Sequence, residues 1–181
     1  MRSKVWTLCF LLALSFCKDK EYLRIEVEKE SGSMVSMRNF SRSSYKETGE
    51  LEWRLKGDES YIFPKENKTI VYGFAFSQFE KGKSTSMMTG DRGEINHKTK
   101  TVILEGKVRL KTNDGKFIET ESLTYNLDEK TLSSEVDVLV YSDGTTIRGK
   151  GLRADKSINK FTILQPKAVT TGGSNPLKEK P

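Results

Sequence analysis

"LEGKVRLKTNDGKFIETESLTYN", residues 104–126, has the features of a β-hairpin. Val108 and Leu110 alternate with charged residues before the sequence TNDGK, and Ile118 and Leu123 follow it. Alternation with a period of two indicates a strand with one buried face. Asn, Asp and Gly readily adopt the backbone conformations of a tight turn. The stretch therefore predicts two antiparallel strands joined by a short turn.

The outline of this hairpin returns in residues 138–155, "VLVYSDGTTIRGKGLRAD". At an offset of 29 residues, the matched pairs are Gly115 and Gly144, Ile118 and Ile147, Thr120 and Gly149, and Leu123 and Leu152. Related patterns begin at Gly57 and Gly90. Four copies spaced near thirty residues predict a supersecondary unit that buries its apolar face by stacking on its own copies. The alternative is that the hairpins resemble one another by chance.

A period of two dominates residues 34–170, and short polar turn sequences interrupt it at regular intervals. The 181 residues suit one domain with short tails. With 35% hydrophobic and 31% charged residues, a sheet with one solvated face fits the composition. We expect an all-β, antiparallel domain that forms a roll of two facing sheets, with internal repeats of about thirty residues.

The N-terminus has the layout of a secretory signal. The segment MRSK, with the basic residues Arg2 and Lys4, precedes the apolar run VWTLCFLLALSF, residues 5–16, and charge returns at Lys18. A helix of this run would be roughly 20 Å long, short of the ~30 Å hydrocarbon core of a bilayer. "LSFC" resembles a bacterial lipobox that ends at Cys17, although Phe16 occupies a position where a small residue is usual. Acylation of Cys17, an uncleaved short anchor and simple secretion all stay open.

These observations predict four segments, which are a signal segment or short anchor (1–16), a lipid attachment site and tether (17–33), the β-domain (34–170) and a flexible C-terminal tail (171–181). Cys9 would be lost with the signal segment. The mature chain would then have no cysteine left for a disulfide, so the fold would depend on packing.

The composition argues against several kinds of function. The formal charge of +6 is spread along the chain, with no basic run longer than two residues, whereas nucleic-acid binding needs a concentrated basic face. His97 is the only histidine and lies in a polar turn sequence, so it predicts neither a catalytic triad nor a metal site. We expect no catalytic residues, metal or cofactor, and no enzymatic activity.

Four segments carry a resemblance to a known family: "GELEWRLKGDESYI", "LEGKV", "DGKFIETESLTYN" and "SSEVDVLVYSDGTTIRGKGLRAD". They resemble LptC, the periplasmic component of lipopolysaccharide export, and more distantly its relative LptA, over about residues 34–170. The resemblance implies a twisted, V-shaped β-jellyroll whose interior holds the acyl chains of lipid A. It also implies docking between an inner-membrane ABC transporter of the LptB/LptF/LptG type and an LptA-like bridge protein. LptC proteins commonly keep a transmembrane helix, and the short apolar run departs from that pattern.

Alternation and the resemblance together predict the residues that line a lipid-binding interior: Trp53, Leu55, Phe74, Phe76, Leu104, Val108, Leu110, Ile118, Leu123, Val138, Val140 and Ile147. We expect a membrane-tethered periplasmic protein that accepts lipopolysaccharide and passes it to a bridge protein. The alternative is a structural or adhesive envelope lipoprotein that uses the β-roll as a scaffold.

The lipobox-like sequence generates a test of the N-terminus. We expect Cys17 to be the first residue of the mature protein and to carry acyl chains. Mass spectrometry of protein extracted from membranes would show a mass without residues 1–16 and with added lipid. An intact segment 1–16, or an unmodified Cys17, would contradict this expectation.

Overall fold

The structure is a computed structural model that describes residues 30–172. The predicted signal segment, Cys17, most of the predicted tether and most of the predicted tail lie outside these residues. Among the described residues, no helix is long and apolar enough to cross a lipid bilayer.

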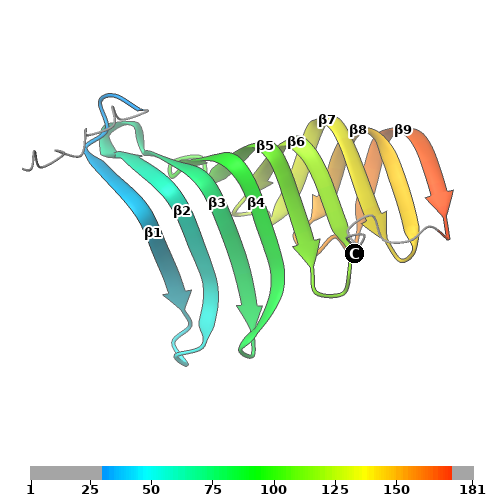
Figure 1. Cartoon of the computed structure of the whole chain (residues 1–181), viewed down its shortest axis with the longest axis horizontal. Coiled ribbons are helices and arrows are strands. Elements are labelled where there is room, and N and C mark those ends of the chain that lie inside the picture. The colour runs from blue at the N-terminus through cyan, green and yellow to red at the C-terminus, as the bar shows by residue number, and fades with distance from the viewer. Residues whose placement is uncertain (1–29, 173–181) are drawn as a thin grey trace, which may run out of the picture. The chain divides into compact units, whose positions relative to one another are not determined.

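Nine antiparallel strands form one sheet in which each strand pairs with its neighbours in sequence (Figure 1). The strands are β1 (Val35–Tyr45), β2 (Leu51–Phe63), β3 (Lys68–Glu80), β4 (Lys83–Asn96), β5 (Thr101–Thr112), β6 (Phe117–Asn126), β7 (Thr131–Ser142), β8 (Thr145–Asp155) and β9 (Phe161–Thr171). A single 3-10 turn, η1 (Pro64–Glu66), lies between β2 and β3. The predicted all-β fold is confirmed, but the roll consists of one continuous sheet and not of two separate sheets.

The sheet bends along a line that crosses the strands near their middles, which we call the crease. There the pairing register shifts by one residue between β4 and β5, and again at each following pair up to β8 and β9. Figure 1 shows the strands curving through this region. The half of each strand on one side of the crease forms the first wall of a V, and the other half forms the second wall.

Two kinds of local chemistry make the crease. Gly73 and Gly106 have φ angles of 56° and 73°, which favour glycine. At Gly106 the carboxylate of Asp91 also fills the space of a side chain, because an added Cβ would lie 2.5 Å from its Oδ2. Between β6 and β7, where glycine is absent from the crease, the buried Thr120 hydroxyl donates to the carbonyl oxygen of Asp137 at 2.9 Å. This bond satisfies one of the backbone carbonyl groups that the bend releases from strand pairing.

The turns that begin each repeat stack on one another at one edge of the sheet, which we call the first turn edge (residues 64–67, 97–100, 127–130 and 156–160). Backbone N–H groups of successive turns donate to the preceding turn: His97 to Asn67 (2.8 Å), Leu127 to Lys100 (2.9 Å) and Lys156 to Lys130 (3.1 Å). The three acceptors have φ angles of 53°, 55° and 57°. This ladder confirms the repeat of about thirty residues as a stack of hairpins.

The V is closed at its C-terminal end. Lys116 follows the turn between β5 and β6, at the opposite or second turn edge, and its Nζ contacts Oδ1 of Asn159 in the first turn edge. The same ammonium lies 3.0 Å from a carboxylate oxygen of Asp114. Ile158 and Phe117 beside this contact are buried. The two turn edges therefore meet here.

The crease generates a prediction at Gly149, where the register between β8 and β9 shifts. A Cβ at this position would lie 2.5 Å from both the carbonyl oxygen of Gln165 and Cγ2 of Ile163. We expect Gly149→Val to lower the free energy of unfolding by about 1 to 3 kcal/mol. Chemical denaturation would measure the loss, with the exposed neighbour Lys150→Val as the control. Equal stability of the two variants would contradict the close packing of β8 on β9.

The closing contact generates a prediction of pH dependence. Hydrogen bonds from the Thr112 hydroxyl and from Lys116 hold the pKa of Asp114 below its usual value. A lowered pKa stabilises the folded state above the ordinary aspartate pKa of about 3.9, and this contribution is lost as the pH falls through the folded-state pKa. Asp114→Asn should therefore destabilise the protein near neutral pH. Its deficit relative to wild type should shrink as the pH falls from about 5 to about 3, and a deficit that does not change with pH would exclude this role.

Candidate functional site

An apolar groove lies between the two walls of the V, and its lining comes from strands β2 to β7 and from the turns that follow β6 and β8. Its cavity volume is about 410 Å³, within the range of about 300 to 1,000 Å³ that is usual for ligand pockets. The second wall contributes Glu52, Trp53, Leu55, Phe76, Gln78, Ser86, Met88 and Leu110, and Phe74 lies on the same side of the crease. The first wall and its turns contribute Val71, Gly93, Ile95, Val102, Leu104, Tyr125, Leu127, Lys130, Leu132 and Lys156.

Strand alternation places the lining. Leu110 pairs with Ile118, and both side chains face the interior, whereas the adjacent pair Arg109 and Glu119 forms an ion pair of 3.0 Å on the outer face. Trp53 and Phe76 come from neighbouring strands, and their ring centroids are 5.9 Å apart. The groove lining therefore comes from inward-facing strand positions, which alternate with charged positions on the outer face.

Glycine makes room for the aromatic side chains at the crease. A Cβ at Gly90 would lie 2.8 Å from two ring atoms of Phe74, and one at Gly57 would lie 2.5 Å from a ring atom of Phe40. The earlier copies of the repeat thus begin with glycine because a neighbouring ring occupies the space over the backbone. Phe74 is buried as a result and forms part of the groove lining.

The interior changes along the sheet from half-buried to buried. Trp53 and Met88 in the N-terminal strands are half-buried, and Ile118, Val140 and Leu152 in the C-terminal strands have no exposed surface. A half-buried apolar lining leaves surface available to a ligand. The groove is therefore most open toward the N-terminal strands, and its lining continues into a packed core in the C-terminal strands.

Of the twelve residues predicted to line the interior, Trp53, Leu55, Phe74, Phe76, Leu104 and Leu110 line the groove. Val108, Ile118, Leu123, Val138 and Val140 lie in the buried core cluster that continues from it. Ile147 pairs with Val140 but is only half-buried, and it lies neither in that cluster nor in the groove. Whether any of these residues contacts lipid stays a prediction.

Sequence reasoning missed part of the lining. Met88 and Tyr125 occupy inward positions because they pair across the strands with Leu110 and Val102. These two inward positions could have been predicted by pairing β4 and β6 with the alternating residues of β5. Lys130 and Lys156 gave no such signal, because they lie in turn sequences where lysine is ordinary. Burial raises the pKa of the Tyr125 phenol above its usual value.

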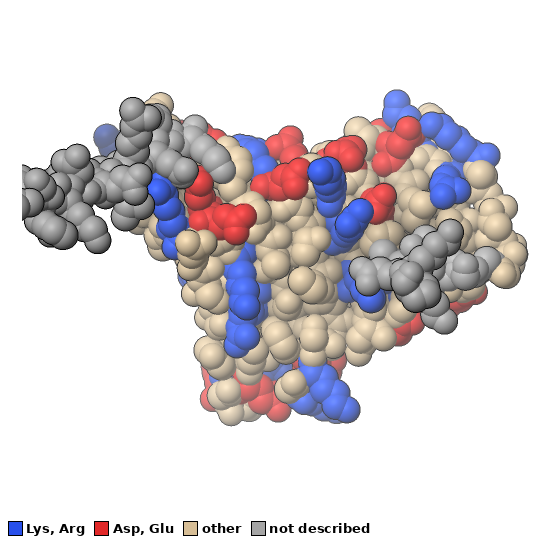
Figure 2. Space-filling view, in the orientation of Figure 1, with Lys and Arg blue, Asp and Glu red and all other residues tan. Residues whose placement is uncertain are grey.

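The outer face carries charges of both signs. Arg92 bonds to Glu94 at 2.6 Å and to Glu105 at 2.8 Å. Partial burial opposes the charged form of Arg92, but hydrogen bonds to both carboxylates outweigh it and raise its pKa. In Figure 2 the acidic and basic side chains of the face in view are interspersed, with uncharged residues between them. No single sign dominates this face.

His97 is exposed, and its Nε2 lies 2.9 Å from the Thr69 hydroxyl oxygen in the first turn edge. Within residues 30–172, His, Cys, Asp and Glu form no group of three that could hold a metal ion. The described side chains that converge in the groove are mainly apolar and offer a surface for a hydrocarbon chain.

Comparison with known proteins agrees with this geometry. The model of the family described as "Lipopolysaccharide-assembly, LptC-related" matches residues 5–171. Among solved structures, the fold is similar to that of LptH from Pseudomonas aeruginosa, described as the LptA homologous periplasmic component of the lipopolysaccharide transport device. The TM-score is 0.52 at 12% sequence identity, and the match covers 61% of this chain and 80% of LptH. The comparison with curated proteins gave no match. Because the family model spans nearly the whole chain, including every strand of the folded sheet, this protein belongs to the LptC family of lipopolysaccharide assembly.

Proposed function

We propose that this protein binds lipopolysaccharide by its acyl chains, in the groove between the two walls. It accepts the glycolipid from an inner-membrane ABC transporter of the LptB/LptF/LptG type and passes it to an LptA-like bridge protein. The observation that carries the proposal is the apolar groove of about 410 Å³ in a member of the LptC family.

The energetics of the groove fit a hydrocarbon ligand. Transfer of one CH₂ group from water into an apolar site is favourable by about 0.8 kcal/mol. Trp53, Leu55 and Phe76 are only half-buried, so an acyl chain would cover apolar surface that water otherwise contacts. Several methylene groups would together offset the loss of freedom on binding.

The end strand β9 offers a surface for a like-folded partner. Within the described residues it pairs only with β8, and its Leu164 and Val169 side chains are exposed. An edge strand of this kind can accept a strand from another protein. Strand addition would join the apolar interiors of two folded sheets, so that a lipid could pass along them without crossing water.

The N-terminus supplies the tether in this proposal. An acylated Cys17, or the apolar run of residues 5–16 left uncleaved, would hold the β-domain in the periplasm at the inner membrane. Either anchor would bring the groove to the membrane that contains the transporter.

Photo-crosslinking during ATP-driven export would test the proposed function. We expect a photo-reactive residue at position 110 to capture lipopolysaccharide, because its side chain lines the groove. The same residue at position 109 or 119 should not, because these side chains form an ion pair on the outer face. Position 76 is an additional test site, since a photo-reactive phenylalanine would replace Phe76 with little change in shape.

Leu110→Asp should abolish capture from position 76, because a carboxylate in the groove costs several kcal/mol unless it is protonated or paired. Lys111→Asp, at the exposed neighbouring position, is the control. Equal labelling from both faces, or normal export by a folded Leu110→Asp protein, would reject the groove. The chain would then be better described as a scaffold of the cell envelope.

A further inference from the structure

Two lysines interrupt the apolar lining of the groove at its rim. Lys130 and Lys156 come from adjacent turns of the first turn edge, and both line the cavity beside Leu127. We propose that these two side chains form a binding site for the phosphate groups of an amphiphile whose hydrocarbon chains occupy the groove. The site extends the proposed function, on which it rests, from the acyl chains to the headgroup.

The backbone fixes the two lysines next to each other. The N–H of Lys156 donates to the carbonyl oxygen of Lys130 at 3.1 Å, in the last bond of the turn ladder. Lys130 has a φ of 57°, as do the equivalent residues of the preceding turns within a few degrees. The two side chains thus extend from neighbouring backbone positions on the rim of the groove. Each is long enough to place its ammonium group in solvent above the apolar lining.

Three of the four acidic side chains near these lysines have other hydrogen-bond partners. The carboxylate of Asp155 accepts hydrogen bonds from the backbone N–H groups of Ser157 and Asn159. The Glu129 carboxylate accepts a hydrogen bond from the Thr131 hydroxyl at 3.3 Å and lines a second concavity beside Thr124 and Ser133. Glu52, from the opposite wall, is the acid that lines the groove itself, and it accepts a hydrogen bond from Ser44 at 3.4 Å. Asp128 is exposed in the turn that contains Lys130.

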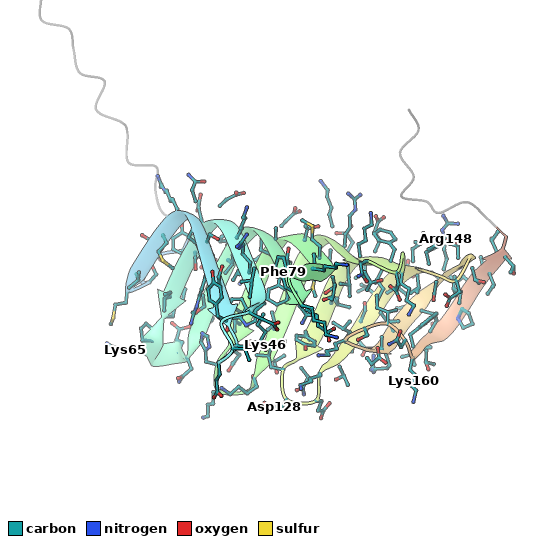
Figure 3. The ribbon with its side chains drawn as sticks, turned by 90° about the horizontal axis from the view of Figure 1, so that it is seen from below. Lys46, Lys65, Phe79, Asp128, Arg148 and Lys160 are labelled. Carbon is teal, nitrogen blue, oxygen red and sulfur yellow. The ribbon has the colours of Figure 1, made fainter. Side chains whose placement is uncertain are left out.

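Among the described residues, neither lysine has a carboxylate within ion-pair distance, whereas Lys68 and Lys116 both do. Figure 3 shows Lys65, Asp128 and Lys160, from three of the four turns, along one margin of the sheet. This margin carries lysines in every turn. The pair at positions 130 and 156 differs from the others because it borders the groove.

The charge of the pair selects the ligand. A phosphate monoester carries about −1.5 to −2 charges at neutral pH, which two ammonium groups can balance, whereas a fatty-acid carboxylate carries one. Lysine binds phosphate as a point charge and needs no fixed orientation. Hydrocarbon chains in the groove and phosphate on the rim therefore describe a phosphorylated lipid.

Binding of three probes to the full-length protein would test the site. The probes are diphosphorylated lipid A, the same lipid A with its phosphates removed, and inorganic phosphate. Fluorescence of Trp53, which lines the groove, reports occupancy in a Trp6→Phe background. The double variant Lys130→Gln/Lys156→Gln is compared with Lys98→Gln/Lys160→Gln, which removes the same charge from the same turn edge outside the groove.

We expect wild type to bind the diphosphorylated lipid about tenfold more tightly than the dephosphorylated lipid, as two exposed ion pairs would allow. Lys130→Gln/Lys156→Gln should remove this preference and leave the affinity for the dephosphorylated lipid unchanged. Lys98→Gln/Lys160→Gln should keep the preference. Added salt should weaken the preference in wild type.

Equal losses in the two double variants, or no loss in either, would overturn the phosphate site. Competition by inorganic phosphate at the concentration of the lipid would also overturn it, because it would identify a free anion as the ligand. If the dephosphorylated lipid still binds in any of these cases, the proposal that the groove binds lipid stands. Failure of wild type to bind either lipid would instead reject the proposed function together with the site.

Discussion

Bending of the backbone at one level in successive strands is the constraint on which the structure depends. A flat sheet of nine strands would leave its apolar face in water, and the crease brings the two halves of that face together. The bend requires positive φ at Gly73 and Gly106, and hydroxyl groups that satisfy the released backbone, as at Thr120. A β-branched residue at either glycine would oppose the bend and separate the walls.

The crease alone does not decide how far the V opens, because that depends on what joins the two turn edges. Lys116 and Asn159 join them at the C-terminal end, where Ile158 completes a packed core. Toward the N-terminal strands the lining includes Trp53 and Phe76, whose rings stand against each other and stay partly exposed. One sheet thus supplies both a core that stabilises the fold and a groove that can take a ligand.

The period of two was sufficient to predict the strands and most of the interior, because alternation assigns side chains such as Leu110 and Ile118 to one face without knowledge of the partner strand. The stack of hairpins was predictable from the sequence repeat, because Asn126 and Asp155 begin equivalent turns. The single folded sheet was not, because the register shifts at the crease depend on pairing between strands. Ile147 shows the limit: it alternates correctly, yet the half of β8 that contains it lies at the margin of the core. The Lys116 contact joins residues 43 positions apart and leaves no local signal.

The groove itself offers little basis for choosing among lipids. Its walls are mainly apolar, and within the described residues no buried side-chain nitrogen or oxygen lacks a hydrogen-bond partner. Hydrophobic transfer grows with the area that is buried and depends weakly on the shape of the chain. Discrimination must therefore come from groups at the rim, where water still competes and contacts can exchange quickly. In the proposed function, apolar walls would hold the hydrocarbon and charged turn residues would recognise the headgroup, so a carrier built this way would be selective and still release its lipid.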